Sequence, residues 1–151
     1  MIHRISFFLL LSVLIIACKT TEKKPFGKDP ALENITWELQ RFNGEAVNLS
    51  GGLKPITLTF EGQSNTFGGS AGCNQCNGMY TTQDEMIKLH KMAVTQMACP
   101  DMKLEQQYLE AMDKVTNYKI THKKQGGVVV QFLYLYIEKT EVAQFQGIPE
   151  K

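Results

Sequence analysis

Short runs in which apolar and polar residues alternate dominate the chain from residue 35 onward, and they predict β-strands. The cleanest alternation covers residues 56–60, where Ile, Leu and Phe occupy one face and Thr the other. Residues 35–42 form another predicted strand, and the Asn43-Gly44 pair that follows favours a tight hairpin turn. Weaker strand patterns cover residues 79–80, 86–89, 118–121 and 142–145, of which the last is expected at a sheet edge.

Two segments depart from simple alternation and constrain the sheet further. Phe67, Gly69, Ala71 and Cys73 fall on one face at period two, and the small residues among them would let another element approach closely. Residues 128–137 are apolar on both faces, which is typical of a central strand or of one that lines a closed sheet.

A single stretch has a convincing helical period. Pro100 fits the first turn of this helix, where a missing N–H costs nothing. The apolar face recurs at spacings of four, four and three, at Leu104, Tyr108, Met112 and Val115. Strands, one helix and then strands again predict an α+β fold, in which an antiparallel sheet packs against one main helix. Residues 35–148 have a suitable length for one such domain.

The first 17 residues have a different character and predict export. A basic start at Arg4 precedes an apolar run from Ile5 to Ala17, which is too short to span a membrane and typical of a signal peptide. The run ends Ile15-Ile16-Ala17-Cys18, which resembles the lipobox of bacterial lipoproteins. That resemblance implies cleavage before Cys18 and lipidation of this cysteine. The alternative is an ordinary signal peptide or membrane anchor with an incidental cysteine.

Residues 18–34 are expected to carry the lipid at Cys18 and then to form a flexible tether. They are polar, contain Pro25, Gly27 and Pro30, and have no apolar period. Such a tether would reach at most roughly 50 Å at about 3.3 Å per residue. Lys19 rather than Asp follows Cys18. By resemblance to the sorting rule of Gram-negative lipoproteins, this predicts the outer membrane, with the domain facing the periplasm.

Charge excludes one class of partner. Residues 1–17 contain one basic and no acidic residue, so the chain that remains after cleavage has a formal net charge of zero. A nucleic-acid-binding domain would need a clustered basic face. We therefore expect no nucleic-acid partner.

Two motifs in the domain resemble those of the META domain family. The first is similar to the family signature GCN-x-x-x-G-x-Y and consists of Gly72, Cys73, Asn74, Gly78 and Tyr80. The second is similar to the family's A-x-T-x-M-x-C element and consists of Ala93, Thr95, Met97 and Cys99. The family's opening strand and helix pattern are also matched, by Trp37-Glu38-Leu39 and by Glu105, Tyr108 and Met112.

The resemblance extends to HslJ-like heat-inducible lipoproteins and implies an α+β fold that forms an incomplete barrel closed by a helix. It implies no enzymatic activity and no cofactor. The expected role is in stress tolerance or in outer-membrane and secretion assembly, through an unidentified envelope protein or an apolar ligand, and we expect a monomer. A ligand would lie in a cleft between the helix face and sheet residues Ile56, Leu58, Phe60, Phe132 and Tyr134. The alternative is that these side chains fill a dry core.

Three cysteines remain in the domain, and two of them hold positions of the family motifs. Because the envelope is oxidising, we expect a disulfide between Cys73 and Cys99. The alternative is a pair of buried thiols that pack as small hydrophobes. Cys76 lies outside the signature and creates Cys73-x-x-Cys76, a spacing found in redox proteins. We interpret it as a structural residue or an alternative disulfide partner.

A zinc or copper site is the alternative function. Cys73, Cys76, His90 and Cys99 have the right number and type of ligands for zinc, and the neighbouring methionines would suit copper(I). The spacing of these residues is irregular, so the main expectation is no metal. The sequence contains no nucleophile elbow, phosphate-binding loop or HExxH motif, and we therefore predict no catalytic residues.

Overall fold

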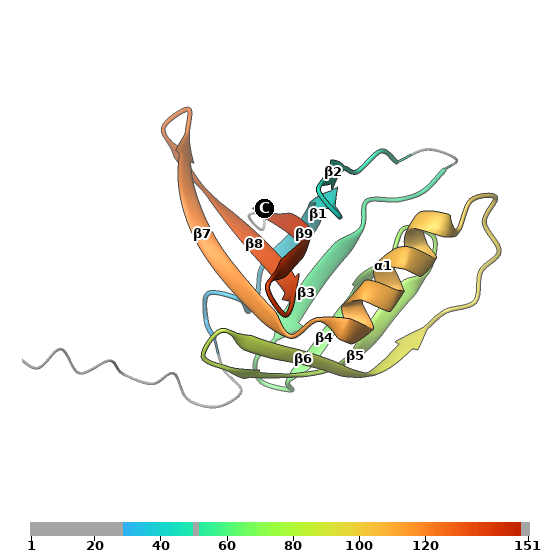
Figure 1. The fold of residues 1–151 in the computed structure, drawn as a ribbon, viewed down its shortest axis with the longest axis horizontal. Helices are drawn as coiled ribbons and strands as arrows, with labels where there is room; N and C mark the ends of the chain where they lie inside the picture. The colour runs from blue at the N-terminus through green and yellow to red at the C-terminus, as the bar shows by residue number, and fades with distance from the viewer. Residues whose placement is uncertain (1–28, 50–51, 149–151) are drawn as a thin grey trace, which may run out of the picture.

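The computed structural model describes residues 29–49 and 52–148. Within these residues the chain forms nine strands and one helix (Figure 1). In chain order they are β1 (Thr36–Phe42), β2 (Glu45–Ala46), β3 (Thr57–Glu61), β4 (Thr66–Ser70), β5 (Gln75–Gln83), β6 (Met86–Val94), α1 (Lys103–Lys114), β7 (Asn117–Gln125), β8 (Val128–Ile137) and β9 (Thr140–Ile148).

The strands follow one another around a ring. Antiparallel pairing joins them in the order β2-β1-β3-β4-β5-β6-β7-β8-β9, and β1 pairs with β9 as well. The ring is not a barrel, because its β6–β7 junction has a single register pair, Met86 with Asn117. The chain forms α1 between these two strands, and the helix lies beside β4, β5 and β6 (Figure 1).

The predicted α+β fold with an incomplete barrel is therefore wrong. The described part of the chain is mainly an antiparallel sheet with one short helix. The error comes partly from β5, whose inward positions include a buried polar residue, Thr82, so that its alternation is hidden in the sequence. The C-terminal strand is also not an edge, since β9 pairs with β8 on one side and β1 on the other.

The core fills the space inside the ring with apolar side chains from the helix and from most strands. The largest of its fully buried members are Trp37, Tyr80, Tyr108, Phe60 and Phe145. Edge-to-face contacts join several of these rings, including Phe42 to Tyr108 at 6.2 Å and Phe60 to Tyr80 at 5.0 Å between centroids. The residues predicted to share one face of β3 are all buried, as alternation requires.

The helix begins later than the sequence suggests. Pro100 and Asp101 precede it, and the N–H of Lys103 donates to Asp101 Oδ1 at 3.0 Å. Three residues of the predicted apolar face, Tyr108, Met112 and Val115, are buried, whereas the fourth, Leu104, is partly buried against the same core. No helix in residues 29–49 and 52–148 is long and apolar enough to cross a membrane.

Residues 29–34 lie at the end of the segment expected to be a tether, yet in the structure they pack against the sheet. The side chain of Leu32 is fully buried, and its carbonyl oxygen accepts a hydrogen bond from Trp37 Nε1 at 3.0 Å. The N–H of Asn34 donates to the carbonyl of Phe60. One apolar residue among polar ones produces no periodic pattern, so the sequence gives no sign of this packing.

Candidate functional site

The side chain of Asn74 connects the two sequence motifs. It lies in the turn that leads into β5 and is almost fully buried. Its Oδ1 accepts hydrogen bonds from Thr95 Oγ1 at 2.9 Å and from the Met97 N–H at 2.7 Å. Its Nδ2 donates to the Met97 carbonyl at 3.3 Å. The first motif thus holds the backbone of the second motif in place.

Glu105 holds the same turn from the helix. Its carboxylate is 1% exposed and accepts backbone N–H bonds from Cys73 at 2.9 Å and from Asn74 at 2.7 Å. The Asn74 side-chain amide donates a third bond, at 2.7 Å. A buried carboxylate must be hydrogen-bonded to be tolerated, and here N–H donors of one turn supply the bonds.

A disulfide joins Cys73 to Cys99, and this confirms the predicted pairing. It connects the turn before β5 to the segment before α1, across a sequence separation of 26 residues. Together with the Asn74 and Glu105 hydrogen bonds, it ties the turn, the segment after β6 and the helix into one unit. We call this unit the motif cluster; it comprises Cys73, Asn74, Thr95, Met97, Cys99 and Glu105.

The remaining motif residues have backbone or packing roles. Gly72 adopts a positive φ of 114°, a conformation that side chains rarely allow. Gly78 lies under the Phe67 ring, and a Cβ there would come within 2.7 Å of that ring. The hydroxyl of Tyr80 donates to Glu33 Oε1 at 3.2 Å. Ala93 pairs with Asn77 in the β5–β6 ladder.

An open groove lies next to the motif cluster. It has a volume of about 380 Å³ and lies between the segment after β6 and the helix. Its lining includes Thr95, Met97, Ala98, Met102 and Leu109. The side chain of Met97 is 59% exposed although its backbone is held by Asn74. An apolar side chain is therefore presented to solvent from a fixed backbone.

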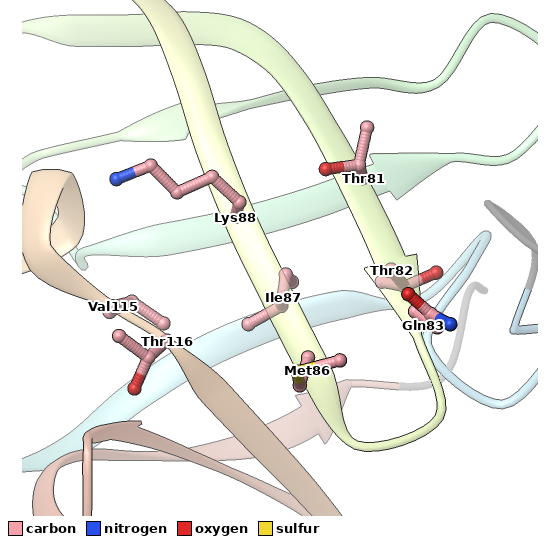
Figure 2. A pocket seen from close by; sticks show the side chains of 8 residues that line it. All are labelled: Thr81, Thr82, Gln83, Met86, Ile87, Lys88, Val115 and Thr116. Carbon is pink, nitrogen blue, oxygen red and sulfur yellow. The ribbon is translucent and has the colours of Figure 1, made fainter.

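A second depression lies where the β5–β6 hairpin meets the connection from α1 to β7. Its volume is about 280 Å³, and its lining is mostly threonine, aliphatic and lysine side chains (Figure 2). Met86 is 51% exposed at its rim. The Lys88 ammonium donates to the carbonyl of Asp113, which fixes one wall. No cluster of ionisable side chains accompanies this depression in the residues that line it.

The apolar cleft expected between helix and sheet is filled by the core. Tyr108 and Met112 pack in one buried cluster with Ile56, Leu58 and Phe60. The side chains of β8 that join this cluster are Leu133 and Leu135, whereas the prediction chose Phe132 and Tyr134. Phe132 lies under the Lys123 ammonium, which is 5.3 Å from its ring centroid. Because β8 is apolar on both faces, its sequence does not reveal which face points inward.

The alternative metal site is not assembled. Cys73 and Cys99 are bonded to each other, while Cys76 lies on β5 in the core and is 3% exposed. Burial raises the pKa of the Cys76 thiol to about 11, so it is protonated at neutral pH. His90 lies on β6 opposite Met79. Within the described residues, no three His, Cys, Asp or Glu side chains are grouped to hold a metal ion.

A second buried polar network attaches residues 29–34 to the sheet. The Tyr118 hydroxyl donates to Asp29 Oδ2 at 2.6 Å, and the Asp29 N–H donates to Glu33 Oε1 at 3.0 Å. Burial raises the pKa of Tyr118 far above its usual value, and the hydrogen bond to Asp29 adds to this effect. Burial also raises the pKa of Tyr80, with the negative charge of Glu33 as the next cause.

From the sequence, Glu105 is assigned only to the helix pattern of the META family, and no role is given to Asp29 or Glu33. A signal for Glu105 was present, because it precedes Tyr108 by three residues and Met112 by seven. An acidic residue at those spacings lies on the apolar face of a helix, where it needs buried partners. Asp29 and Glu33 follow no comparable pattern.

The ring of strands, the disulfide and the motif cluster define a small domain that is mainly an antiparallel sheet with one helix. The profile of the META domain family matches residues 30–147, and the chain belongs to that family. An NMR structure of a protein from Burkholderia xenovorans has the same fold, with a TM-score of 0.59 and 22% identity. That match covers 79% of this chain and 85% of the other. A comparison with curated proteins finds no match.

Proposed function

We propose that this protein is a lipid-anchored member of the META family and acts at the cell envelope. Cleavage before Cys18 and acylation of this cysteine would hold the domain at the outer membrane, facing the periplasm. The disulfide between Cys73 and Cys99 supports an oxidising compartment, because such bonds persist outside the cytoplasm. The HslJ-like lipoproteins that its motifs resemble suggest a role in stress tolerance or in outer-membrane and secretion assembly.

The domain acts by binding an apolar segment of an envelope partner, at the groove beside the motif cluster. The observation that carries this proposal is Met97, which is 59% exposed while its N–H and carbonyl are both bonded to Asn74. Binding costs less conformational entropy when the backbone of the contact residue is already fixed in the free protein. Methionine suits an apolar partner, since its flexible thioether adapts to irregular surfaces.

Binding rather than catalysis fits the way the polar groups are used. Glu105 and Asn74 lie inside the fold, where their oxygen atoms accept bonds from N–H groups and a hydroxyl of the domain itself. The Cys76 thiol is buried and protonated. Asn74 and Glu105 stabilise the surface that carries Met97, whose apolar side chain reaches solvent next to the exposed Thr95 and Gln96.

Membrane anchorage is tested by following acylation in cells. Radioactive palmitate should label the wild-type chain, and Cys18→Ala should abolish both the label and the membrane fraction of the protein. Blocking lipoprotein signal peptidase should leave a longer precursor. An unlabelled wild-type protein in the soluble fraction would reject the anchor while leaving the binding surface to be tested separately.

Partner binding is tested with a photo-crosslinking amino acid at position 97 of the lipidated protein. The matched control places it at Met86, which is 51% exposed and lies outside the groove. Crosslinks to one defined envelope protein from position 97, and not from position 86, are the expected result. Equal crosslinking from both positions would show that the groove has no specific partner.

A further inference from the structure

The β7–β8 hairpin projects from the ring and ends in exposed valines. The ladder between β8 and β9 begins at Phe132, so residues 128–131 pair only with β7. On one side, residues 128–131 line an open groove of about 560 Å³ with Asn34, Ile35 and residues 146–148. Figure 1 shows the tip of this hairpin extending beyond the other strands.

The tip of this hairpin carries two of the three most exposed large apolar side chains in the described residues. Val128 is 65% exposed and Val129 is 55% exposed. The turn before them consists of Gly126 and Gly127, both at positive φ, so no side chain of the turn covers the valines. Leaving two neighbouring β-branched residues in water is unfavourable unless another surface covers them.

The charges on the hairpin indicate what that surface is. Residues 117–137 contain no Asp or Glu, and Lys123 and Lys124 are exposed directly beside the valines. Lys119 and His122 lie nearer the base, where Asp29, Asp84 and Glu85 line the same depression. The net positive charge is therefore concentrated at the tip, together with the apolar side chains. This combination is complementary to an anionic lipid surface.

We propose that the β7–β8 hairpin inserts Val128 and Val129 into the interface of an anionic phospholipid membrane, with Lys123 and Lys124 at the headgroups. Each lysine near such a surface strengthens the attraction to anionic headgroups. Neither the valines nor the lysines belong to the motif cluster, so this contact is separate from the proposed partner groove.

The position of the N-terminal segment allows the anchor and the hairpin to contact one membrane. Asp29 is bonded to Tyr118, at the base of β7, and the hairpin tip lies seven residues further along the strand. That distance is about 23 Å, while the chain from Cys18 to Asp29 can extend about 35 Å. The inference therefore deepens the proposed membrane anchorage, but it is tested without the lipid.

The test uses the chain from residue 19, which carries no acyl group and contains every residue of the observed core. It is mixed with vesicles of phosphatidylcholine alone or of equal parts phosphatidylcholine and phosphatidylglycerol, and then sedimented. We expect binding to the phosphatidylglycerol vesicles, weakening as salt rises. Lys123→Gln/Lys124→Gln should weaken it roughly tenfold or more, and Val128→Ser/Val129→Ser about tenfold.

Matched controls separate the hairpin from general charge and apolar exposure. Lys54→Gln/Lys139→Gln removes the same charge from exposed positions outside the hairpin, and Met86→Ser removes a side chain as exposed as Val129. Both should bind like the wild type. Equal losses in the controls, or no binding of the wild type to phosphatidylglycerol vesicles, would overturn the proposal.

Insertion itself is read from Val128→Trp. Trp37 is fully buried, so a change in emission reports on the new tryptophan at the tip. We expect a blue shift on adding phosphatidylglycerol vesicles. Binding without a blue shift would overturn insertion. If the protein sediments even without vesicles, and Val128→Ser/Val129→Ser abolishes this sedimentation, the valines pair with a second copy of the chain instead. If the wild-type chain takes up no palmitate in cells while the chain from residue 19 still binds these vesicles, the anchor is rejected and the hairpin contact is kept.

Discussion

Asn74 donates two hydrogen bonds to Glu105, one from its backbone N–H and one from its side-chain amide, each 2.7 Å long. The two residues are 31 positions apart in the chain. One lies in the turn before β5 and the other in the first turn of α1. The pair explains why a GCN motif and a helical glutamate belong to the same structural unit. The turn supplies N–H donors to the buried carboxylate, and the carboxylate supplies acceptor oxygens to the buried N–H groups.

Glu105→Gln should destabilise the fold by about 2–3 kcal/mol. The carboxylate accepts three N–H bonds, whereas an amide of the same shape would direct its own N–H₂ at one or more of those donors. Urea unfolding measures the change. Glu110→Gln is the control, because Glu110 is exposed on the same helix and its substitution should alter the free energy of unfolding by less than about 0.5 kcal/mol. Equal stability of both variants would contradict the proposed role.

Two adjacent glycines in β4 should respond differently to alanine. A Cβ at Gly69 would lie 2.0 Å from the carbonyl oxygen of Thr57, so β3 must move, whereas a Cβ at Gly68 meets its nearest atom at 3.8 Å. We expect Gly69→Ala to cost about 3 kcal/mol and Gly68→Ala to stay within about 0.5 kcal/mol of the wild type. Thermal and urea unfolding of the pair would show this, and a similar loss in both would argue against the close approach of β3.

The sequence predicts local structure better than long-range structure here. The close approach at Gly69 and the extent of β8 follow from patterns within a few residues. The inward face of β8 does not, because one face carries valine, phenylalanine and tyrosine and the other carries valine, leucine and isoleucine. Both faces are apolar, so only the neighbouring strands decide between Phe132 and Leu133. The closure of the ring by β1 and β9 is likewise a contact between the two ends of the domain.

The motif cluster shows the same limit. The residues of both motifs could be identified by resemblance, and the disulfide was expected from the motif positions of Cys73 and Cys99 together with an oxidising compartment. That Asn74 holds Met97 and that Glu105 holds Asn74 could not be predicted, because hydrogen bonds between residues 23 and 31 positions apart leave no periodic signal. Leu32 is a related case, since one buried residue in a polar segment has no pattern.

Tyr118→Phe should loosen the attachment of residues 29–34 to the sheet. The Tyr118 hydroxyl donates to Asp29 at 2.6 Å in a buried position, and losing a bond to a carboxylate costs about 1.5–3 kcal/mol. Hydrogen exchange at the N–H of Asn34, which donates to Phe60, should become faster. Tyr134→Phe is the control, because the described residues show no hydrogen bond of its hydroxyl. Unchanged exchange in Tyr118→Phe would mean that the remaining contacts, such as Trp37 with Leu32 and Tyr80 with Glu33, are sufficient to hold the segment.

Cys76 should make stability depend on pH above about 9. Burial raises its thiol pKa from 9.0 to about 11, so the folded state disfavours the thiolate that the unfolded chain forms readily. The contribution is therefore fully present below pH 9 and is lost as the pH rises toward 11. Tyr80 and Tyr118 act in the same direction, but only from their usual value of 10.0 upward.

The measurement that isolates Cys76 is urea unfolding between pH 8 and about 10, in the wild type and in Cys76→Ala. The wild type should lose stability across this window, and Cys76→Ala, which is less stable at pH 8 because of the lost packing, should lose less. Native protein should also resist iodoacetamide at pH 8 and react after unfolding, because the thiol is buried and protonated. Rapid alkylation of the folded protein would show that the Cys76 thiol reaches solvent and is reactive, which would contradict its burial.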